Sequence, residues 1–516
     1  MDLEPMDRWT DRVPGPLLKD STHARFSTRS GFERDEAARS YRQPPVPIAE
    51  MSSDVGPVAS TRLDEVRLCL CEKLILQAHA SGRPGCHNEV GRDVKQFRTQ
   101  TPEKEPGSPS RPTKLPPNPV EYEKEVYQKG LQFARPPFTF QTGLWEPHAK
   151  ERMSAESKGY VAGNAGTGET SLKNREAFAR WSIVPRRLVK TKSLPDLSTK
   201  VLGQKFPFPI AVAPVGVQRI FNPQGEIASA AAAAKSMTPY IMSTASSTSI
   251  EEVAKANGDG VRWFQLYWPT NENNNITLSI LSRAKKAGFS ALFVTLDTYI
   301  LGWRPSDMDN GYNPFLRSDQ IGVAIGFTDP VFRKQFKQKY GVEIEDDMHT
   351  AAAEWTQTVF PSLSHGWEDL EFIKQHWDGP IILKGIQTVE DAQKCVEMGV
   401  QGIVVSNHGG RQVDGGVSSL GVLPRIVDAV GDKLDIFFDS GIRAGADIAK
   451  AMALGARMCL IGRPYVYGLA LGGENGVGHV LNSLLGDMQL TLHLAGIPSA
   501  DPAHLNRSVL EREDRL

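Results

Sequence analysis

The sequence predicts an α/β protein in which eight strands and their intervening helices close into a (β/α)8 barrel, the TIM barrel. From residue 208 onward, short runs rich in β-branched and aromatic residues alternate with longer amphipathic runs. This alternation is typical of parallel strands joined by helices. The short runs number eight, and polar residues follow nearly all of them. Eight strands favour a closed barrel over an open doubly wound sheet, and such a barrel carries its chemistry at these strand ends.

Each expected element follows from its residue pattern. The expected strands are 209–213, 240–243, 262–267, 291–295, 381–384, 402–406, 436–439 and 458–461. The helices expected between them are 224–235, 250–256, 276–287, 389–397, 420–430 and 445–454. Before the barrel, helical patterns near 122–133 and 151–160 predict an N-terminal helical extension.

The alternation is interrupted once, between Asp307 and Trp367, after the fourth strand. A connection of this length is uncommon unless it has a function or secondary structure of its own. We therefore expect a long insertion that acts as a lid or an elaborated loop.

Residues 1–117 differ from the rest of the chain in being rich in Pro, Ser, Arg and Asp. Such a segment buries too little apolar surface to offset the entropy lost on ordering it, so a disordered tail is expected. One short helix near 62–78 is the exception. The expected domains are this tail, the barrel domain at 118–507 and a C-terminal tail at 508–516.

Composition and charge argue against several classes of function. A formal net charge of -1 gives no reason to expect binding to nucleic acid or to an acidic membrane surface. No apolar run is long enough to span a bilayer, and the charged first residues lack the apolar core of a signal peptide. A cytoplasmic protein is therefore expected. The five cysteines match no standard zinc spacing, so no metal site is expected.

The segment 406–412, Ser-Asn-His-Gly-Gly-Arg-Gln, directly follows the apolar run 402–405. A histidine and an arginine three residues apart at a strand end offer a base and an anion clamp together. A hydroxy acid needs both, because one group must take a proton and another must hold the carboxylate. The alternative is a turn whose histidine is only hydrogen-bonded.

The remaining strand ends are polar in a consistent way. Lys384 ends a buried strand, where an unpaired ammonium group is costly and calls for an anionic partner. The last two strand ends combine glycine with arginine, and a helix begins nearby at residue 445. These features favour a phosphate site; turn glycines with arginines paired to surface carboxylates are the alternative. Together the polar ends indicate a large ring system across the barrel mouth.

On these motifs the chain resembles the FMN-dependent α-hydroxy-acid oxidase and dehydrogenase family over about residues 119–507. The segment 406–412 is similar to the active-site signature of that family. Further motifs match in order and spacing at 264–267, 383–385, 439–443 and 461–464. Within the family, the long insertion and the segments 160–166, 180–186, 311–317 and 327–332 are most similar to the lactate 2-monooxygenase branch.

The resemblance implies FMN as the cofactor and a role for each matched residue. For catalysis it implies His408 as the base, Asp297 as its partner, Tyr267 near the substrate hydroxyl and Lys384 beside the flavin. For substrate binding it implies Tyr160, Arg304 and Arg411, together with Tyr267. The residues implied in cofactor binding are Pro214, Val215, Gly216, Ser243, Gln265, Thr295, Lys384, Ser406, Asp439, Gly441, Arg443, Gly462 and Arg463.

Gly216 departs from the family pattern, because many hydroxy-acid oxidases carry alanine at this position. Our hypothesis is that the missing methyl group leaves room for a bulkier substrate side chain or alters how oxygen reacts. A substrate profile that is unchanged in Gly216→Ala would refute it.

The function implied is the oxidation of a small, lactate-like L-2-hydroxy acid, with dioxygen as the electron acceptor. In a monooxygenase, the keto acid and peroxide react before leaving and give a decarboxylated acid; in an oxidase they leave separately. Transfer of electrons to a haem partner is less favoured. A non-catalytic flavin-binding barrel is the alternative of another class, and the intact set of polar residues argues against it. By analogy with the family, we expect a homo-oligomer with no nucleic-acid or membrane partner.

Overall fold

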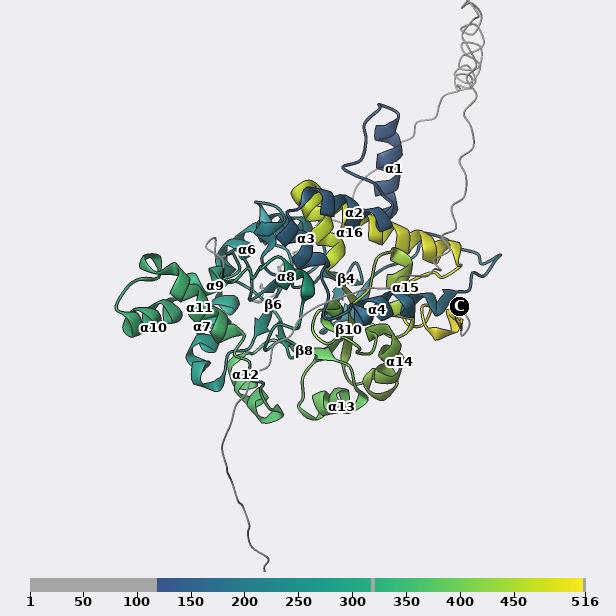
Figure 1. The fold of residues 1–516 in the computed structure, drawn as a ribbon. Helices are drawn as coiled ribbons and strands as arrows, with labels where there is room; N and C mark the ends of the chain where they lie inside the picture. The colour runs from purple at the N-terminus through teal and green to yellow at the C-terminus, as the bar shows by residue number, and fades with distance from the viewer. Residues whose placement is uncertain (1–117, 317–320, 514–516) are drawn as a thin grey trace, which may run out of the picture. The chain divides into compact units, whose positions relative to one another are not determined.

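The computed structural model describes residues 118–316 and 321–513, and within them eight parallel strands close into a barrel (Figure 1). Each strand pairs with the next one along the chain, and the last closes on the first through the pairing of Cys459 with Ile210. The predicted barrel is confirmed, and the predicted strand ends differ from the observed ones by at most two residues. The barrel strands are β4 (Ile210–Val212), β5 (Tyr240–Ser243), β6 (Arg262–Tyr267), β7 (Leu292–Thr295), β8 (Ile381–Ile386), β9 (Gly402–Val405), β10 (Asp435–Phe438) and β11 (Met458–Ile461).

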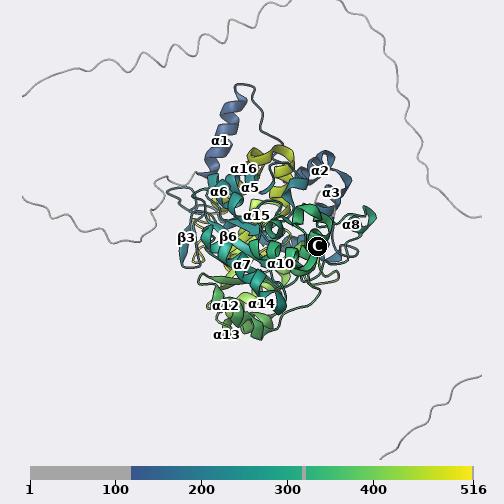
Figure 2. The same ribbon diagram turned by 90° about the vertical axis from the view of Figure 1, so that its left-hand side faces the viewer.

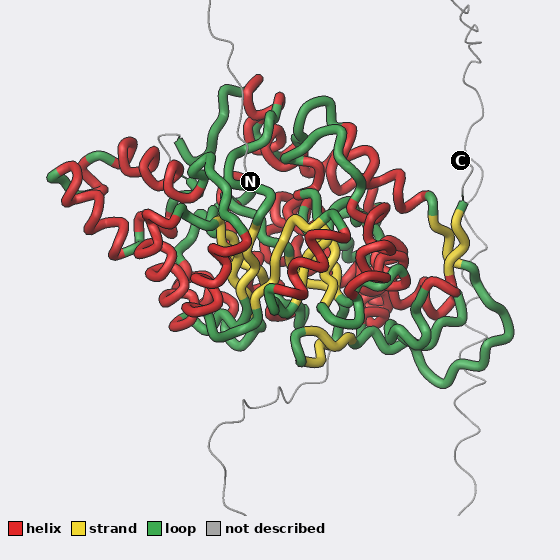
Figure 3. Tube along the Cα trace, turned by 90° about the horizontal axis from the view of Figure 1, so that it is seen from below, coloured by secondary structure: helices red, strands yellow, loops and turns green. Residues whose placement is uncertain are grey.

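The interior of the barrel is a packed apolar core rather than a channel. Alternate strand residues point inward, and the Trp263 ring stacks on Phe293 with 5.4 Å between ring centroids. A hairpin of β2 (Thr199–Val201) and β3 (Gln204–Phe206) adds Phe206 to this core, 5.6 Å from Trp263. Figure 3 shows the strands, in yellow, ringed by helices in red.

The helices that follow the strands pack outside the barrel. They are α5 (Gly225–Lys235), α6 (Ile250–Asn257), α7 (Asn274–Lys286), α12 (Leu370–His376), α13 (Val389–Glu397), α14 (Ser419–Val430), α15 (Gly445–Ala453) and α16 (Arg463–Leu494). The sequence did not predict α16, whose helical geometry breaks at Gly472 and Gly473. A β-carbon on Gly468 would lie 2.5 Å from the carbonyl oxygen of Gly476, so glycine permits the two halves of α16 to approach closely.

The N-terminal extension consists of α1 (Pro119–Gly130), α2 (Thr142–Arg152), α3 (Ala155–Ala162) and α4 (Glu169–Ala179). α1 extends from the rest of the barrel domain (Figures 1 and 2). The helix predicted over 151–160 is observed as α3, but its predicted start was wrong, because α2 ends only at Arg152 and α3 begins at Ala155. The side chain of Ser154 then accepts a hydrogen bond from the Ser157 N–H and begins α3.

Regular structure continues past the predicted end of the domain at residue 507. The short strand β12 (Leu510–Arg512) pairs antiparallel with β1 (Trp181–Ile183). The C-terminal segment therefore packs against the N-terminal extension up to Arg512.

The insertion after the fourth barrel strand forms helices as well as loops. It contains α8 (Pro305–Asp309), α9 (Ala324–Phe327), α10 (Pro330–Tyr340) and α11 (Met348–Val359), and Figure 1 shows the last three beside α7. The buried Asp329 caps α10 and accepts hydrogen bonds from Ser279 and Arg283 of α7, at 2.8 and 3.2 Å. These bonds fasten the insertion to the barrel.

No helix in the described part of the chain is both long and apolar enough to cross a membrane. The predictions of a disordered tail at 1–117 and of a helix near 62–78 lie outside the described residues.

Candidate active site

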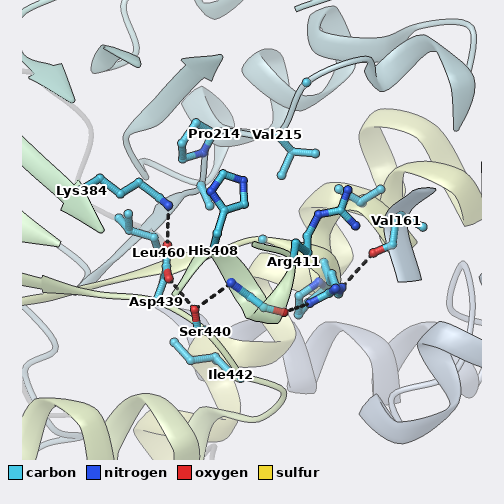
Figure 4. Close-up of a pocket in the computed structure, with 18 of the residues that line it drawn as sticks. Val161, Pro214, Val215, Lys384, His408, Arg411, Asp439, Ser440, Ile442 and Leu460 are labelled. Atoms are coloured by element: carbon cyan, nitrogen blue, oxygen red, sulfur yellow. Dashed lines mark hydrogen bonds and ion pairs between the residues drawn. The ribbon is translucent and has the colours of Figure 1, made fainter. Parts of the chain in front are cut away.

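A pocket opens at the C-terminal ends of the barrel strands (Figure 4). The segments after β4, β9, β10 and β11 form its wall, together with Tyr160 and Val161 of α3, Tyr267 of β6 and Lys384 of β8. The predicted residues that line it are Tyr160, Pro214, Val215, Gly216, Tyr267, Lys384, His408, Arg411, Asp439, Gly441, Arg443, Gly462 and Arg463.

His408 and Asp297 form a hydrogen-bonded pair beside this pocket. The Nδ1 atom of His408 lies 2.9 Å from Oδ1 of Asp297. Burial lowers the pKa of His408 below its ordinary value, although the charge of Asp297 opposes that shift. Since Nδ1 is held by the carboxylate, Nε2 of a neutral ring is the atom available to take a proton.

Lys384 lies between two carboxylates. Its side chain is buried, and its ammonium group is 3.9 Å from Asp297 and 3.7 Å from Asp439. It also donates a hydrogen bond to the Ser406 hydroxyl at 3.1 Å. Burial opposes the charge of Asp297, but Lys384 and His408 outweigh it and hold the pKa of this carboxyl well below its ordinary value. Asp297 is therefore ionised at neutral pH.

Arg411 lies on the side of His408 away from Lys384 (Figure 4), and Arg304 is hydrogen-bonded to the backbone of Arg411. Arg304 is buried and donates to the carbonyl of Arg411 at 3.1 Å and to the Gln412 side chain at 2.7 Å. Arg411 donates to the carbonyls of Tyr160 and Gly163, and its guanidinium lies 4.8 Å from the centre of the Tyr160 ring. Burial and the charge of Arg411 lower the pKa of Arg304 to about 10.

Within residues 118–316 and 321–513, neither Arg304 nor Arg411 forms an ion pair with a carboxylate. Two adjacent positive charges that donate hydrogen bonds only to neutral groups favour an anion between them. The arrangement therefore suits the carboxylate of a small acid placed next to His408.

Some predicted residues lie behind the pocket wall. Ser243 donates to Gln265, and Gln265 donates to Thr295, each at 3.0 Å, across β5, β6 and β7. Ser406 accepts from Lys384. This buried row of hydrogen bonds fixes the side chains of adjacent strand ends. Asp297 and Arg304 also lie outside the pocket lining, and they bind His408 and the backbone of Arg411.

Arg463 differs from the expectation in its contacts. Its guanidinium donates to the carbonyls of Val161, Gly163 and Gly409 and to the Asn164 side chain, at 2.8–2.9 Å. It thus joins the N-terminal extension to the loop after β9. Its expected contact with a phosphate stays a prediction.

The charged residues of the pocket fit FMN. Arg443 lines the pocket, and its side chain donates to the carbonyl of Ile442 rather than to a carboxylate. Gly441, with φ of +100°, and Gly462 line the same part of the pocket. At the start of α15, by contrast, the backbone N–H groups of residues 443–445 already donate to the carboxylates of Asp447 and Asp487. The Arg443 guanidinium therefore suits a phosphate, and the ammonium group of Lys384 suits a ring that carries negative charge on reduction.

Sequence reasoning missed two supporting residues. The Thr298 hydroxyl lies 3.0 Å from Nδ1 of His408 and donates to Asp297 at 2.9 Å. The Ser440 hydroxyl accepts from the Gly409 N–H at 3.0 Å and donates to Asp439 at 2.7 Å. Both directly follow a predicted carboxylate in the sequence, which is the signal that could have identified them.

Comparison with known proteins agrees with this arrangement. Residues 149–512 match the family model of the FMN-dependent dehydrogenases. An FMN-dependent alpha-hydroxy acid dehydrogenase of Schizosaccharomyces pombe is 64% identical over 77% of this chain and 97% of its own length. The human 2-hydroxyacid oxidase 1 is 38% identical over 68% of this chain and 91% of its own.

A solved structure, that of a mandelate oxidase, superposes with a TM-score of 0.61 and 34% identity, over 73% of this chain and 99% of that one. The family match spans more than half of the chain, and the relatives are covered almost entirely. The chain therefore belongs to the FMN-dependent dehydrogenase family, whose members use FMN to oxidise α-hydroxy acids.

Proposed function

We propose that this protein oxidises a small, lactate-like L-2-hydroxy acid and passes the electrons to dioxygen, in a reaction like that of lactate 2-monooxygenase. The observation that carries the proposal is the pair Arg304 and Arg411, which lacks a carboxylate partner among the described residues and lies beside His408. The substrate carboxylate would supply the missing negative charge and place the substrate carbon near the base.

The proposed roles follow from the charges and hydrogen bonds of the site. His408 takes a proton from the substrate at Nε2, and the ionised Asp297 stabilises the imidazolium that forms. Burial raises the pKa of Tyr267, so its hydroxyl stays protonated and can donate to the substrate. Tyr160 and the two arginines hold the carboxylate.

FMN, when bound, accepts the two electrons that leave the substrate. The residues proposed to hold it are Pro214, Val215, Gly216, Ser243, Gln265, Thr295, Lys384, Ser406, Asp439, Gly441, Arg443, Gly462 and Arg463. Lys384 would stabilise negative charge on the reduced ring because its ammonium group is fixed by two carboxylates and a hydroxyl.

Two observations support the small hydroxy acid and the oxygen acceptor. Relatives of this chain include an L-lactate oxidase of Lysinibacillus sphaericus, 40% identical over 92% of its length. The helical insertion, which resembles that of the monooxygenase branch, is fastened to α7 through Asp329, and the ring of Phe360 at the end of α11 lies 4.9 Å from the ring of Tyr267. A covered site favours reaction of the keto acid with peroxide before either escapes.

The test is to supply the purified protein with L-lactate in air and to measure the products. Acetate with carbon dioxide and without free peroxide supports the monooxygenase, in which lactate and dioxygen give acetate, carbon dioxide and water. Pyruvate with an equal amount of hydrogen peroxide indicates the second candidate, an oxidase. Protein that binds FMN but turns over no 2-hydroxy acid would refute both and favour a non-catalytic barrel.

The proposal also includes a homo-oligomer, by analogy with the family, and a cytoplasmic location. Light scattering on the purified full-length chain would test the first, and microscopy of a C-terminally tagged chain the second.

A further inference from the structure

The loop that follows β4 holds an unusual backbone conformation next to the pocket. Val217 has φ of +51° and ψ of 34°, and a β-branched residue rarely adopts this left-handed region. Such conformations persist only where surrounding contacts fix them, and they gather at functional sites. The neighbouring Pro214 and Val215 line the pocket, on the opposite side from Ser440 and Ile442 (Figure 4).

The side chain of Gln218 fastens this loop from behind. It is fully buried, and its amide nitrogen donates to the carbonyl of Val215 at 2.9 Å. The same nitrogen lies 3.0 and 3.1 Å from the hydroxyl groups of Tyr240 and Tyr465, and the amide oxygen accepts from Ser229 at 2.7 Å. The two N–H bonds of the amide therefore face three acceptors, one of which is the Val215 carbonyl, and the amide oxygen is held by Ser229.

Glu226, in the first turn of α5, holds Gln218 in turn. Its carboxylate is fully buried and accepts from the backbone N–H of Gln218 at 3.1 Å and of Ser247 at 2.8 Å. The hydroxyl groups of Ser247 and Thr248 donate to it at 2.5 and 2.9 Å. Within the described residues, no lysine, arginine or histidine pairs with this carboxylate. A buried charge compensated by hydrogen bonds alone requires that all of them be kept.

The contacts of Glu226 join two loops of the barrel mouth. One is the loop after β4, through Gln218; the other is the loop after β5, through Ser247. The two loops also meet directly, because the N–H of Val217 donates to the carbonyl of Ala245 at 2.9 Å. Neither Glu226 nor Gln218 lines the pocket, so both act on it only through the backbone that they hold.

We propose that Glu226 and Gln218 are positioning residues that hold the loop of Pro214 to Val217 against the flavin ring. The inference rests on the flavin site proposed above. Because the Val215 carbonyl is a fixed dipole at the pocket wall, releasing it would change the electrostatic environment of the ring as well as the stability of the fold.

The test uses two variants of the purified, FMN-loaded enzyme, Glu226→Gln and Gln218→Met. The first replaces two of the acceptor sites of the carboxylate by a donor group, and the second keeps the length of the side chain but cannot donate to Val215. We expect each to shift the two-electron midpoint potential of bound FMN by about 30 mV or more, equivalent to a tenfold change in the relative affinity for its two redox states. We also expect kcat to fall by about tenfold or more, with a smaller change in KM.

The matched control is Asp329→Asn. Asp329 is also a fully buried carboxylate, held by hydrogen bonds and by an ion pair with Arg283, but it anchors the insertion on α7. This variant should lower the unfolding temperature and leave the flavin potential and absorption spectrum as in the parent protein.

Variants that unfold at lower temperature but keep the potential, the spectrum and kcat of the parent would overturn the inference. If Glu226→Gln does not fold, Gln218→Met decides alone, since it leaves the buried carboxylate and its partners intact. FMN binding by the parent protein is measured first, before any variant is made. A parent protein that binds no FMN would refute the flavin site itself and this inference with it.

Discussion

The two mouths of the barrel are built from the same eight strands but differ in chemistry. At the N-terminal mouth, the hairpin of β2 and β3 packs Phe206 against Trp263, and the residues of this core are apolar. At the C-terminal mouth, the ammonium group of Lys384 lies 3.9 Å from the carboxylate of Asp297, and that carboxylate lies 2.9 Å from Nδ1 of His408.

Left-handed backbone does not by itself separate the two mouths. Val217, His408 and Ser440 have positive φ and follow barrel strands at the C-terminal mouth, but Leu202, in the turn of β2–β3, and Met237, just before β5, have positive φ at the other end. What differs is the chemistry next to these residues, because at the C-terminal mouth they carry or adjoin groups that line the pocket. Contacts that stabilise the barrel dominate at the N-terminal mouth, and groups held for reaction dominate at the C-terminal mouth.

The largest effect is expected from His408→Asn. Asparagine tolerates the left-handed backbone at this position, where φ is +56°, but cannot serve as a base near neutral pH. We expect kcat to fall by about 10²- to 10⁴-fold, the usual contribution of a general base. Bound FMN and the unfolding temperature should stay close to those of the parent. A variant that keeps full turnover would exclude His408 as the base.

The opposite behaviour is expected from Phe206→Ala at the other mouth. This ring is buried, and its removal leaves a cavity beside Trp263. We expect the free energy of unfolding to fall by about 3–5 kcal/mol, measured by denaturant titration. Turnover per bound FMN should be unchanged in the molecules that remain folded. A loss of turnover without a loss of stability would contradict the separation of the two mouths.

Sequence periodicity predicted the eight strands because both sets of strand residues are apolar, one facing the interior and one facing the helices. It failed for α16, where glycines that permit close contact between Gly468 and Gly476 also reduce the helical signal. The hairpin β2–β3 was missed because each strand has three residues, which is too short for a pattern.

The candidate site could be predicted through its motifs, but the contacts within it could not. The order Lys384, Ser406 and His408 along the sequence indicates strand ends, whereas the hydrogen bond from Lys384 to Ser406 depends on the pairing of β8 with β9. Arg463 shows the limit, since its partners Val161 and Gly163 lie some 300 positions earlier in the chain. Only the fold brings such residues together.

The pH dependence of kcat/KM should distinguish the carboxylates of the two mouths. His408 acts as a base only when neutral, so kcat/KM should rise with pH through the pKa of His408 and then level off. Burial lowers this pKa, which places the acid limb below the ordinary histidine value of 6.5. Asp297→Asn removes the charge that opposes this shift, so the limb should move to still lower pH while kcat also falls.

Asp435→Asn is the control for this profile. Asp435 lies at the N-terminal mouth, where its carboxylate accepts the N–H of Leu202 at 2.6 Å. Its replacement should leave the acid limb in place. A limb that moves to higher pH in Asp297→Asn would contradict the assignment of Asp297 as the partner that favours the imidazolium.

The smallest effect is expected from Gly216→Ala, and it refines the hypothesis that the missing methyl group leaves open space. A β-carbon at Gly216 would lie 2.7 Å from both the β-carbon and the carbonyl oxygen of Ala245, so that space is already filled by the loop after β5. We expect the variant to push the two loops apart and to change the ratio of kcat/KM between L-lactate and a bulkier 2-hydroxy acid by up to about tenfold. The double variant Gly216→Ala with Ala245→Gly removes the contact between the two β-carbons but keeps the one with the carbonyl. If the double variant returns the ratio toward the parent value, the effect is due to side-chain crowding. If the ratio stays shifted, the effect is due to the backbone contact. An unchanged ratio in the single variant would refute a role for Gly216 in substrate choice.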